Sequence, residues 1–216
     1  MDKQLLILSL PAFLLALTCH EVAHGYVARR LGDPTAEESG RLSLNPLKHI
    51  SPFGTIIFPF LLWYFKSPII FGWAKPVPVD PRYFRNPLKG MMWVGMAGPA
   101  TNIVLAGIAA LIFRGLVGVS EAAAFGQFSL LIQFLLVFIL INAVLCVFNL
   151  IPIPPLDGSR IVAGLLPRSW ARVYLRVERY GFMLLILLLW LGVFRRVIFP
   201  VSWKIAEALI GYKLVG

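Results

Sequence analysis

The chain has few charges, few cysteines and few histidines for its 216 residues. Only 14% of its residues are charged, against about 25% in an ordinary soluble domain, so the composition excludes that class. Basic residues outnumber acidic ones by 20 to 10, but they lie in short loops between apolar runs. This arrangement is typical of charge retained on the cytoplasmic side of a membrane, and we expect no nucleic acid partner. Cys19 and Cys146 lie inside apolar runs, which excludes a secreted disulfide framework.

Long apolar runs are abundant. Hydrophobic residues make up 59% of the chain, and the runs at 5–27, 91–117 and 128–150 reach the length of about 20 residues that a membrane-spanning helix needs. A shorter run covers 182–194, and 202–214 is amphipathic. The first run has no small-residue cleavage site, so we expect it to be retained. The pattern predicts an all-α polytopic membrane protein with five to six membrane segments.

The distribution of basic residues predicts how these segments cross the membrane. The link at 118–127 has no basic residue, whereas 75–90 and 159–179 are rich in them, so we expect the link outside and the other two segments in the cytoplasm. The first run also ends in a basic pair, Arg29-Arg30, so residues 53–73 should enter and leave the membrane from one side. This predicts a re-entrant or hairpin element between the first core helix and the next long apolar run.

We expect a single integral-membrane domain over 1–216, with a core at 5–166 and C-terminal helices at 170–216. The pair Arg195-Arg196 does not fit a single outward pass of the preceding apolar run. Two arrangements therefore remain for 202–214, an interfacial helix or a short sixth span.

His20 and His24 lie near the end of the first apolar run, with Glu21 between them. Ionisable groups are rare at membrane depth and indicate function there. Positions i and i+4 share one face of a helix, so both imidazoles can bind one metal ion, and this spacing is that of metal hydrolases. Glu21 can then serve as the general base for a water activated by the metal. The structural alternative is two histidines hydrogen-bonded to neighbouring carbonyls in a packed bundle.

Asp157 is the best candidate for the third protein ligand that a zinc hydrolase needs beside an open position for water. It follows a proline run that must break the preceding helix, because proline has no amide proton to continue the hydrogen-bond ladder. As an alternative, Asp157 caps a helix that begins near Ser159. Other candidate ligands lie in loops: Glu37, Glu38, Asp80 and His49.

Three motifs occur together in this chain: His20-Glu21-Val22-Ala23-His24, Asn149-Leu150-Ile151-Pro152-Ile153-Pro154-Pro155-Leu156-Asp157-Gly158, and Met96-Ala97-Gly98-Pro99-Ala100-Thr101-Asn102. Together they resemble the site-2 protease family of intramembrane zinc metalloproteases. The resemblance covers roughly 5–166. It resembles a minimal form of that family, without an inserted PDZ module or an appended CBS pair.

The resemblance implies one zinc ion on His20, His24 and Asp157, with Glu21 as general base and acid. It also implies that Asn149 and Asn102 contact the substrate or the developing oxyanion. These residue roles are expectations carried over from the family.

The function implied is that of a zinc metalloendopeptidase that hydrolyses peptide bonds within or near transmembrane segments of single-pass membrane proteins. Regulated intramembrane proteolysis and clearance of signal-peptide remnants are the roles it suggests. We expect an integral protein of a prokaryotic cytoplasmic membrane. Its active site should lie in the cytoplasmic half of the lipid bilayer, because His24 precedes the basic Arg29-Arg30 pair by only roughly 7 Å of helix.

Cleavage of a membrane helix requires local unwinding, and the freed amides then need hydrogen-bond partners. The stretches 72–79 and 150–156 are two candidates to supply them by strand addition. Two other functions compete with proteolysis. One is a catalytically inactive metal-binding scaffold, and the other is an ion or metal transporter, which the lack of an obvious internal repeat disfavours.

Overall fold

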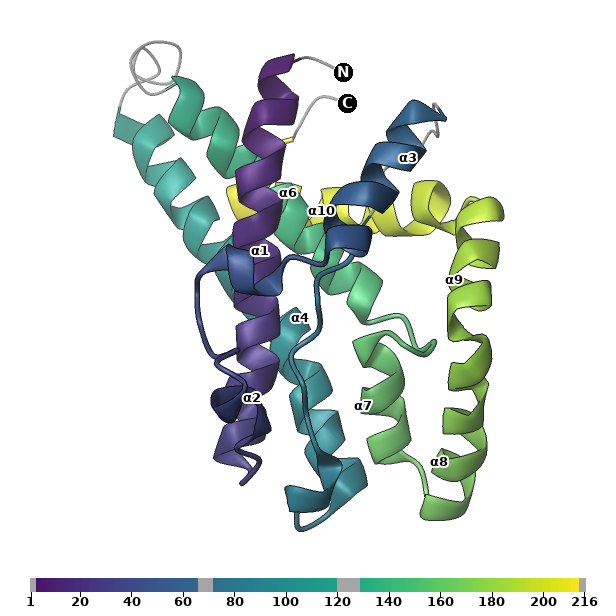
Figure 1. The fold of residues 1–216 in the computed structure, drawn as a ribbon. Helices are drawn as coiled ribbons and strands as arrows, with labels where there is room; N and C mark the ends of the chain where they lie inside the picture. The colour runs from purple at the N-terminus through teal and green to yellow at the C-terminus, as the bar shows by residue number, and fades with distance from the viewer. Residues whose placement is uncertain (1–2, 66–71, 120–128, 214–216) are drawn as a thin grey trace.

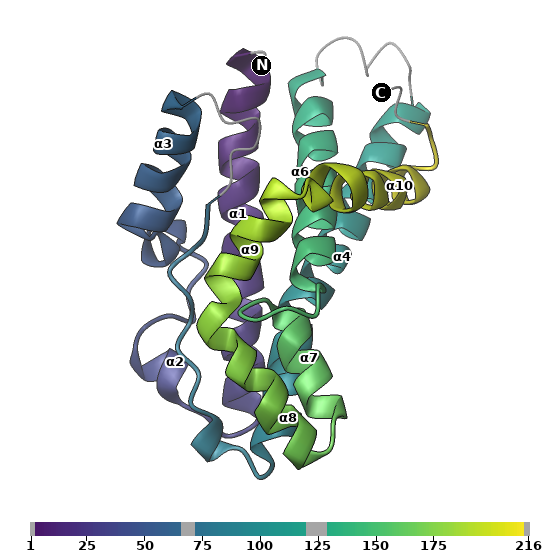
Figure 2. The ribbon, with the colours of Figure 1, turned by 90° about the vertical axis from the view of Figure 1, so that its right-hand side faces the viewer.

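The computed structural model describes residues 3–65, 72–119 and 129–213, shown from two directions in Figures 1 and 2. These residues form helices joined by loops, with no β-strand among them. The helices are α1 Lys3–Arg30, α2 Thr35–Glu38, α3 Phe58–Tyr64, α4 Pro87–Val119, α6 Ser129–Asn149, α7 Asp157–Leu165, α8 Arg168–Leu175, α9 Gly181–Trp190 and α10 Phe199–Ile210. Short turns of 3-10 or π type cover Pro46–His49, Pro52–Ile57, Pro81–Tyr83, Arg176–Tyr180 and Phe194–Ile198. The predicted all-α fold is confirmed for the described residues.

Three helices, α1, α4 and α6, are long and apolar enough to cross a membrane. A bent pair, Arg168–Trp190 with Phe194–Ile210, turns by 66° at its break and makes a fourth span if counted as one. Three to four helical spans therefore fit an integral membrane protein. The count of five to six segments and the re-entrant element at 53–73 stay predictions. Residues 66–71 and most of the link at 118–127 lie outside the described residues.

Small residues let the long helices pack closely. Ala12 and Ala16 of α1 are buried in one core with Ala106, Ala109 and Ala110 of α4. Short side chains at such contacts allow membrane helices to approach each other. The buried residues of α6 follow a helical stripe that faces this core: Ile132, Leu135, Phe138, Ile139, Asn142, Ala143 and Cys146. One face of α6 is therefore committed to packing against α1 and α4.

The segments predicted to be cytoplasmic lie at one end of the bundle. Figure 1 shows the C-terminal end of α1, the start of α4 and the connection from α7 to α8 together at the lower end. Pro87 and Leu88 at the start of α4 line one hollow with Arg168 and Arg172 of α8. The basic segments 75–90 and 159–179 are therefore neighbours in space.

Residues 72–80 form no helix or strand and run alongside α1. Three backbone amides anchor them: Lys75 N–H donates to His49 O at 2.9 Å, Val77 N–H to Glu21 Oε2 at 2.9 Å, and Asp80 N–H to Asp33 Oδ2 at 2.7 Å. The buried Arg41 adds hydrogen bonds from its guanidinium to Lys48 O and Lys75 O. These bonds tie the segment to α1 and to the loop at 41–50.

The chain breaks between α6 and α7 at the proline run. α6 ends at Asn149 and α7 begins at Asp157. Gly158 lies so close to the intervening loop that a Cβ there would come 2.3 Å from Leu150 O. Only glycine fits at this position, and the close approach sets Asp157 at the point where the new helix starts.

α10 lies across the bundle and contacts α6 and α4 (Figure 2). Its buried residues are Ser202, Ala206 and Ile210, spaced four apart, so one face of the helix packs inward. The amphipathic pattern predicted over 202–214 therefore serves helix packing as far as Ile210, where α10 ends. The choice between an interfacial helix and a short sixth span stays a prediction.

Candidate metal centre

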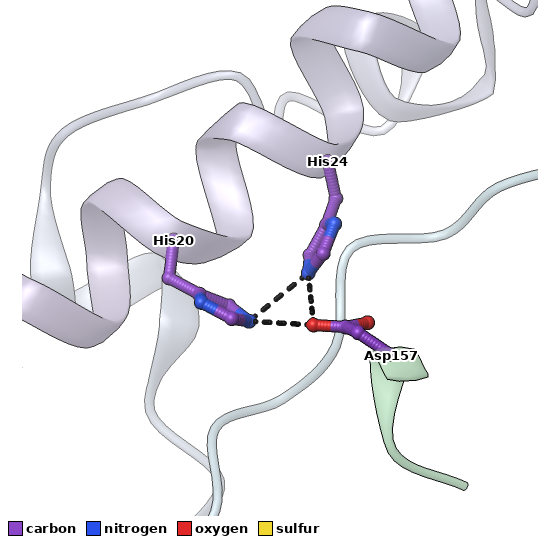
Figure 3. A group of neighbouring side chains, drawn as sticks. All are labelled: His20, His24 and Asp157. Carbon is purple, nitrogen blue, oxygen red and sulfur yellow. Dashed lines mark hydrogen bonds and ion pairs between the residues drawn. The ribbon is translucent and has the colours of Figure 1, made fainter. Parts of the chain in front are cut away.

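His20 and His24 project from one face of α1 and meet Asp157 at the start of α7 (Figure 3). Their Nε2 atoms are 3.0 Å apart. Asp157 Oδ2 lies 3.1 Å from His20 Nε2 and 3.2 Å from His24 Nε2. All three residues are buried, with 3%, 5% and 6% of their surfaces exposed. The helical spacing brings the histidines together, and the break before α7 brings the aspartate to them.

The Nδ1 atoms of both histidines point away from this meeting point. His24 Nδ1 lies 2.6 Å from the backbone oxygen of Val94, and His20 Nδ1 lies 2.6 Å from Asn102 Oδ1. Carbonyl oxygens only accept hydrogen bonds, so each Nδ1 carries the proton and donates it. Each Nε2 therefore keeps a free lone pair on the side of Asp157.

Three lone pairs thus converge with no proton between them. Asp157 Oδ2 is buried without a hydrogen-bond donor, which is unfavourable unless a cation occupies the space. A tetrahedral zinc ion with bonds of about 2.0 Å would separate its ligand atoms by about 3.3 Å. The observed separations of 3.0 to 3.2 Å fit that arrangement. Among the described residues this is the one group of at least three His, Cys, Asp or Glu able to hold a metal.

Gly98 of α4 leaves the space that the two imidazoles occupy. A Cβ at this position would lie 2.4 Å from His20 Cε1 and 2.6 Å from Nε2 of both histidines. Cβ atoms essentially never approach other atoms so closely. The glycine of the Met96–Asn102 motif is therefore required for a steric reason.

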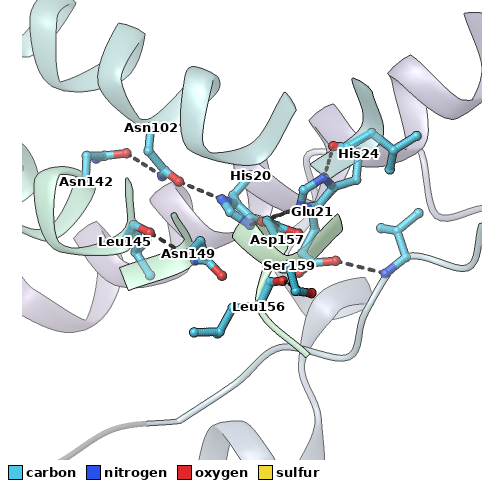
Figure 4. A network of polar contacts seen from close by, with 12 residues as sticks. His20, Glu21, His24, Asn102, Asn142, Leu145, Asn149, Leu156, Asp157 and Ser159 are labelled. Atoms are coloured by element: carbon cyan, nitrogen blue, oxygen red, sulfur yellow. Dashed lines mark hydrogen bonds and ion pairs between the residues drawn. The ribbon is translucent and has the colours of Figure 1, made fainter. Parts of the chain in front are cut away.

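Glu21 follows His20 on α1, and its carboxylate accepts a hydrogen bond from Val77 N–H at 2.9 Å (Figure 4). It is not one of the three convergent ligands, so it remains free for proton transfer. Pro76 and Pro78 have no amide proton, so Val77 is the only possible backbone donor of its tripeptide. The segment 72–80 thus contacts the side chain predicted to be the general base.

The two asparagines predicted to contact substrate are placed differently. Asn102 is fully buried, and its amide bridges His20 and Asn142. Asn149 is partly buried and donates from Nδ2 to Leu145 O at 3.0 Å, one turn back in α6. A substrate role for either asparagine stays a prediction. The bonds of Asn102 are those of a residue that orients His20.

Three of the four alternative ligands have other partners: Glu37 pairs with Arg29 at 2.7 Å, Asp80 pairs with Arg82 at 2.6 Å, and His49 Nε2 lies 2.8 Å from Ser43 O. Hydrogen bonds from Arg82 hold the pKa of the Asp80 carboxyl below its ordinary value. A capping role for Asp157 is not observed. The helix begins at Asp157 itself, and Leu156 occupies the capping position without a side-chain bond.

Two contributions to the site were not predicted from the sequence. The backbone oxygen of Val94 orients His24, and a backbone carbonyl has no sequence signal. Asn142 bonds to Asn102. Its signal was available, because it is a polar residue in the middle of the apolar run at 128–150, where polar side chains are rare and usually functional.

The fold and the site define a class, a metalloprotein whose metal centre is buried within a bundle of membrane-length helices. The model of one family, Peptidase family M50, matches residues 9–192. The chain therefore belongs to peptidase family M50, the site-2 protease family, as its motifs predicted. The family membership, the names of its relatives and the ligand group identify zinc as the cofactor.

Relatives in several bacteria are similar over most of this chain. The protein named "Putative zinc metalloprotease YwhC" of Bacillus subtilis is 41% identical over 81% of this chain and 76% of its own length. Two proteins named "Putative zinc metalloprotease Rip2" match this chain over 66% of their own lengths. That of Mycolicibacterium smegmatis is 32% identical over 85% of this chain, and that of Mycobacterium tuberculosis is 25% identical over 84%. No solved structure matches the chain.

Proposed function

We propose that this protein is an intramembrane zinc metalloprotease that hydrolyses peptide bonds within or near transmembrane segments of single-pass membrane proteins. The observation that carries the proposal is the convergence of His20 Nε2, His24 Nε2 and Asp157 Oδ2 within 3.0 to 3.2 Å of one another, while the Nδ1 atom of each histidine faces an acceptor on its far side. Three protein ligands are the number found in catalytic zinc sites, which keep a further position for water or substrate.

Zinc in this group would lower the pKa of a water to about 7 and polarise the peptide carbonyl. Glu21 takes a proton from the attacking water as the water oxygen bonds to the carbonyl carbon. It then gives that proton to the leaving nitrogen as the C–N bond breaks. The hydrogen bond from Val77 N–H holds the Glu21 carboxylate in one orientation for both transfers.

We assign substrate docking to the segment 72–80 in preference to the loop at 150–156, because Val77 of that segment forms a hydrogen bond with Glu21. An unwound substrate can add alongside such a segment as a strand and satisfy the amides it exposes. Since Val77 N–H is already engaged with Glu21, the substrate would pair with other backbone groups of the segment.

We place the site in the cytoplasmic half of a prokaryotic cytoplasmic membrane. Support comes from the basic pair Arg29-Arg30 at the end of the helix that carries both histidines. Regulated proteolysis of membrane proteins and clearance of signal-peptide remnants are the two roles that such an enzyme would serve.

Replacing Glu21 with glutamine tests the proposal. The Glu21→Gln protein should bind one zinc ion and lose cleavage of a model transmembrane substrate by about 10²–10⁴-fold, because glutamine cannot accept the proton. Metal content is measured on purified protein, and cleavage is measured in liposomes. Substrates trapped by the same variant can be identified by mass spectrometry.

Three further variants complete this experiment. His20→Ala and Asp157→Ala should lose both zinc and cleavage. Glu37→Gln makes the same chemical change at a glutamate paired with Arg29 and should keep both. Undiminished proteolysis by the Glu21→Gln protein would refute the assignment.

A further inference from the structure

Asn142 begins a chain of hydrogen bonds that crosses three helices and ends on a histidine of the metal centre (Figure 4). On α6, Asn142 Nδ2 donates to Phe138 O at 2.8 Å. Asn142 Oδ1 accepts from Asn102 Nδ2 of α4 at 2.9 Å, and Asn102 Oδ1 lies 2.6 Å from His20 Nδ1 on α1. Both asparagines are completely buried, so water does not compete for these bonds.

The direction of this chain is set at its first member. Phe138 O is a backbone carbonyl and can only accept, so the NH₂ group of Asn142 must face it. Asn142 then presents its oxygen to Asn102, which must turn its own NH₂ group toward that oxygen. The oxygen of Asn102 is left to face His20. Turning either amide around would place two acceptors or two donors against each other.

The end of the chain is the tautomer of His20. A free imidazole carries its proton on either ring nitrogen, and a metal binds only the nitrogen without it. Since Asn102 offers an acceptor, the proton lies on Nδ1 and the lone pair on Nε2, which faces Asp157. His24 needs no such chain, because Val94 O accepts from its Nδ1 directly.

We propose that Asn142 is a positioning residue of the metal centre, which acts through Asn102 to keep the His20 proton on Nδ1 and its Nε2 free for zinc. The inference rests on the zinc site of the proposed function and adds a residue that touches neither metal nor substrate. A purely structural role would tie α4 to α6 and leave the tautomer unchanged.

Two changes at one position separate these roles. Asn142→Leu removes the acceptor that sets the orientation of the Asn102 amide. Asn142→Asp keeps an oxygen facing Asn102 whether the new carboxyl group is protonated or ionised. Ile139→Ala is the matched control, because Ile139 is buried on the same face of α6, one turn away, and belongs to no hydrogen bond of the chain. It perturbs packing and leaves the chain intact.

The first readout is the tautomer of His20. It is measured from two-bond couplings between ring protons and nitrogen-15 in NMR spectra of metal-free protein labelled at its three histidines. His20 should carry its proton on Nδ1 in the wild type, Asn142→Asp and Ile139→Ala proteins, and should show both tautomers in Asn142→Leu. The second readout is zinc affinity by chelator competition. Asn142→Leu should weaken it by about tenfold, in the range of outer-shell partners of metal ligands, and the other two variants should not.

Three results would overturn the proposal. One is a His20 proton on Nε2 in the wild-type protein, which requires no variant to fold. Another is a wild-type tautomer and wild-type affinity in Asn142→Leu, and the third is an equal loss of affinity in all three variants. A failure of the protein to bind zinc would instead refute the proposed function, while the metal-free NMR measurement would still decide the role of Asn142.

Discussion

Gly98 of α4 lies closer to the two histidines than a residue with a side chain could. Because glycine has no Cβ, both Nε2 atoms fit beside the helix at this position. Elsewhere on the same helix, Gly107 and Gly115 have no neighbour within 4 Å of the Cβ position. Glycine is thus required at one of these positions by contact, and the other two have no such constraint.

Replacing Gly98 with alanine should weaken zinc binding by about 10–100-fold, because the new methyl group would push both imidazoles away from Asp157. Zinc affinity of the purified protein, from chelator competition, is the measurement. Gly107→Ala makes the same change on the same helix in open space and should bind zinc like the wild type. Equal affinities in the two variants would show that the site tolerates the methyl group.

At the scale of elements, the segment 72–80 depends on α1 for its position. Besides the bond from Val77 to Glu21, the segment approaches α1 at Gly25, where a Cβ would come 2.9 Å from Val77 Cγ1 and 2.7 Å from Leu42 Cδ2. The helix therefore presents His20 and His24 on one face and accommodates this segment at the neighbouring Gly25. The two contacts with Val77, at Glu21 and at Gly25, lie about one turn apart on α1.

Gly25→Ala should lower cleavage by about tenfold and leave zinc affinity within a factor of two, because displacement of the segment loosens the Val77 bond to Glu21 without touching a ligand atom. Turnover in liposomes and metal content report the two effects separately. Gly115→Ala serves as the control for adding a methyl group. If turnover in Gly25→Ala matched that control, the segment would have no part in positioning Glu21.

At the scale of the whole molecule, the basic segments gather at one end of the bundle. The basic end of α1, the start of α4 and the start of α8 lie together, and the N-terminal end of α1 lies at the opposite end of the bundle (Figure 1). Loop charge alone predicted that these three basic segments share a side. The metal centre therefore lies nearer to the end that carries the positive charge.

Cysteine labelling in intact cells tests this orientation. In a background that carries Cys19→Ser and Cys146→Ala, we expect Arg85→Cys and Arg172→Cys to react with a membrane-impermeant maleimide only after permeabilisation. Gln4→Cys, at the opposite end of α1, should react from outside. Labelling of Arg85→Cys and Arg172→Cys in intact cells would reverse the proposed topology.

Much of the fold was predictable because its signals are local. The run predicted at 5–27 became α1 at Lys3–Arg30, and that at 128–150 became α6 at Ser129–Asn149. Length and apolar composition are sufficient for such helices. The C-terminal helices were less predictable, because α10 packs against α6 and α4 after a 66° bend that no local pattern indicated.

The sequence by itself determined the paired histidines, since a spacing of four residues puts two side chains on one face of any helix. It also narrowed the candidates for the third ligand to Asp157, a few other acids and His49. Only the tertiary structure shows where these candidates lie: Asp157 lies against both histidines, whereas Glu37 and Asp80 pair with arginines. The partners that orient the site are 56 to 82 residues away in sequence from Glu21, His24 and His20. Contacts at that separation follow from how the helices pack, and local periodicity does not encode them.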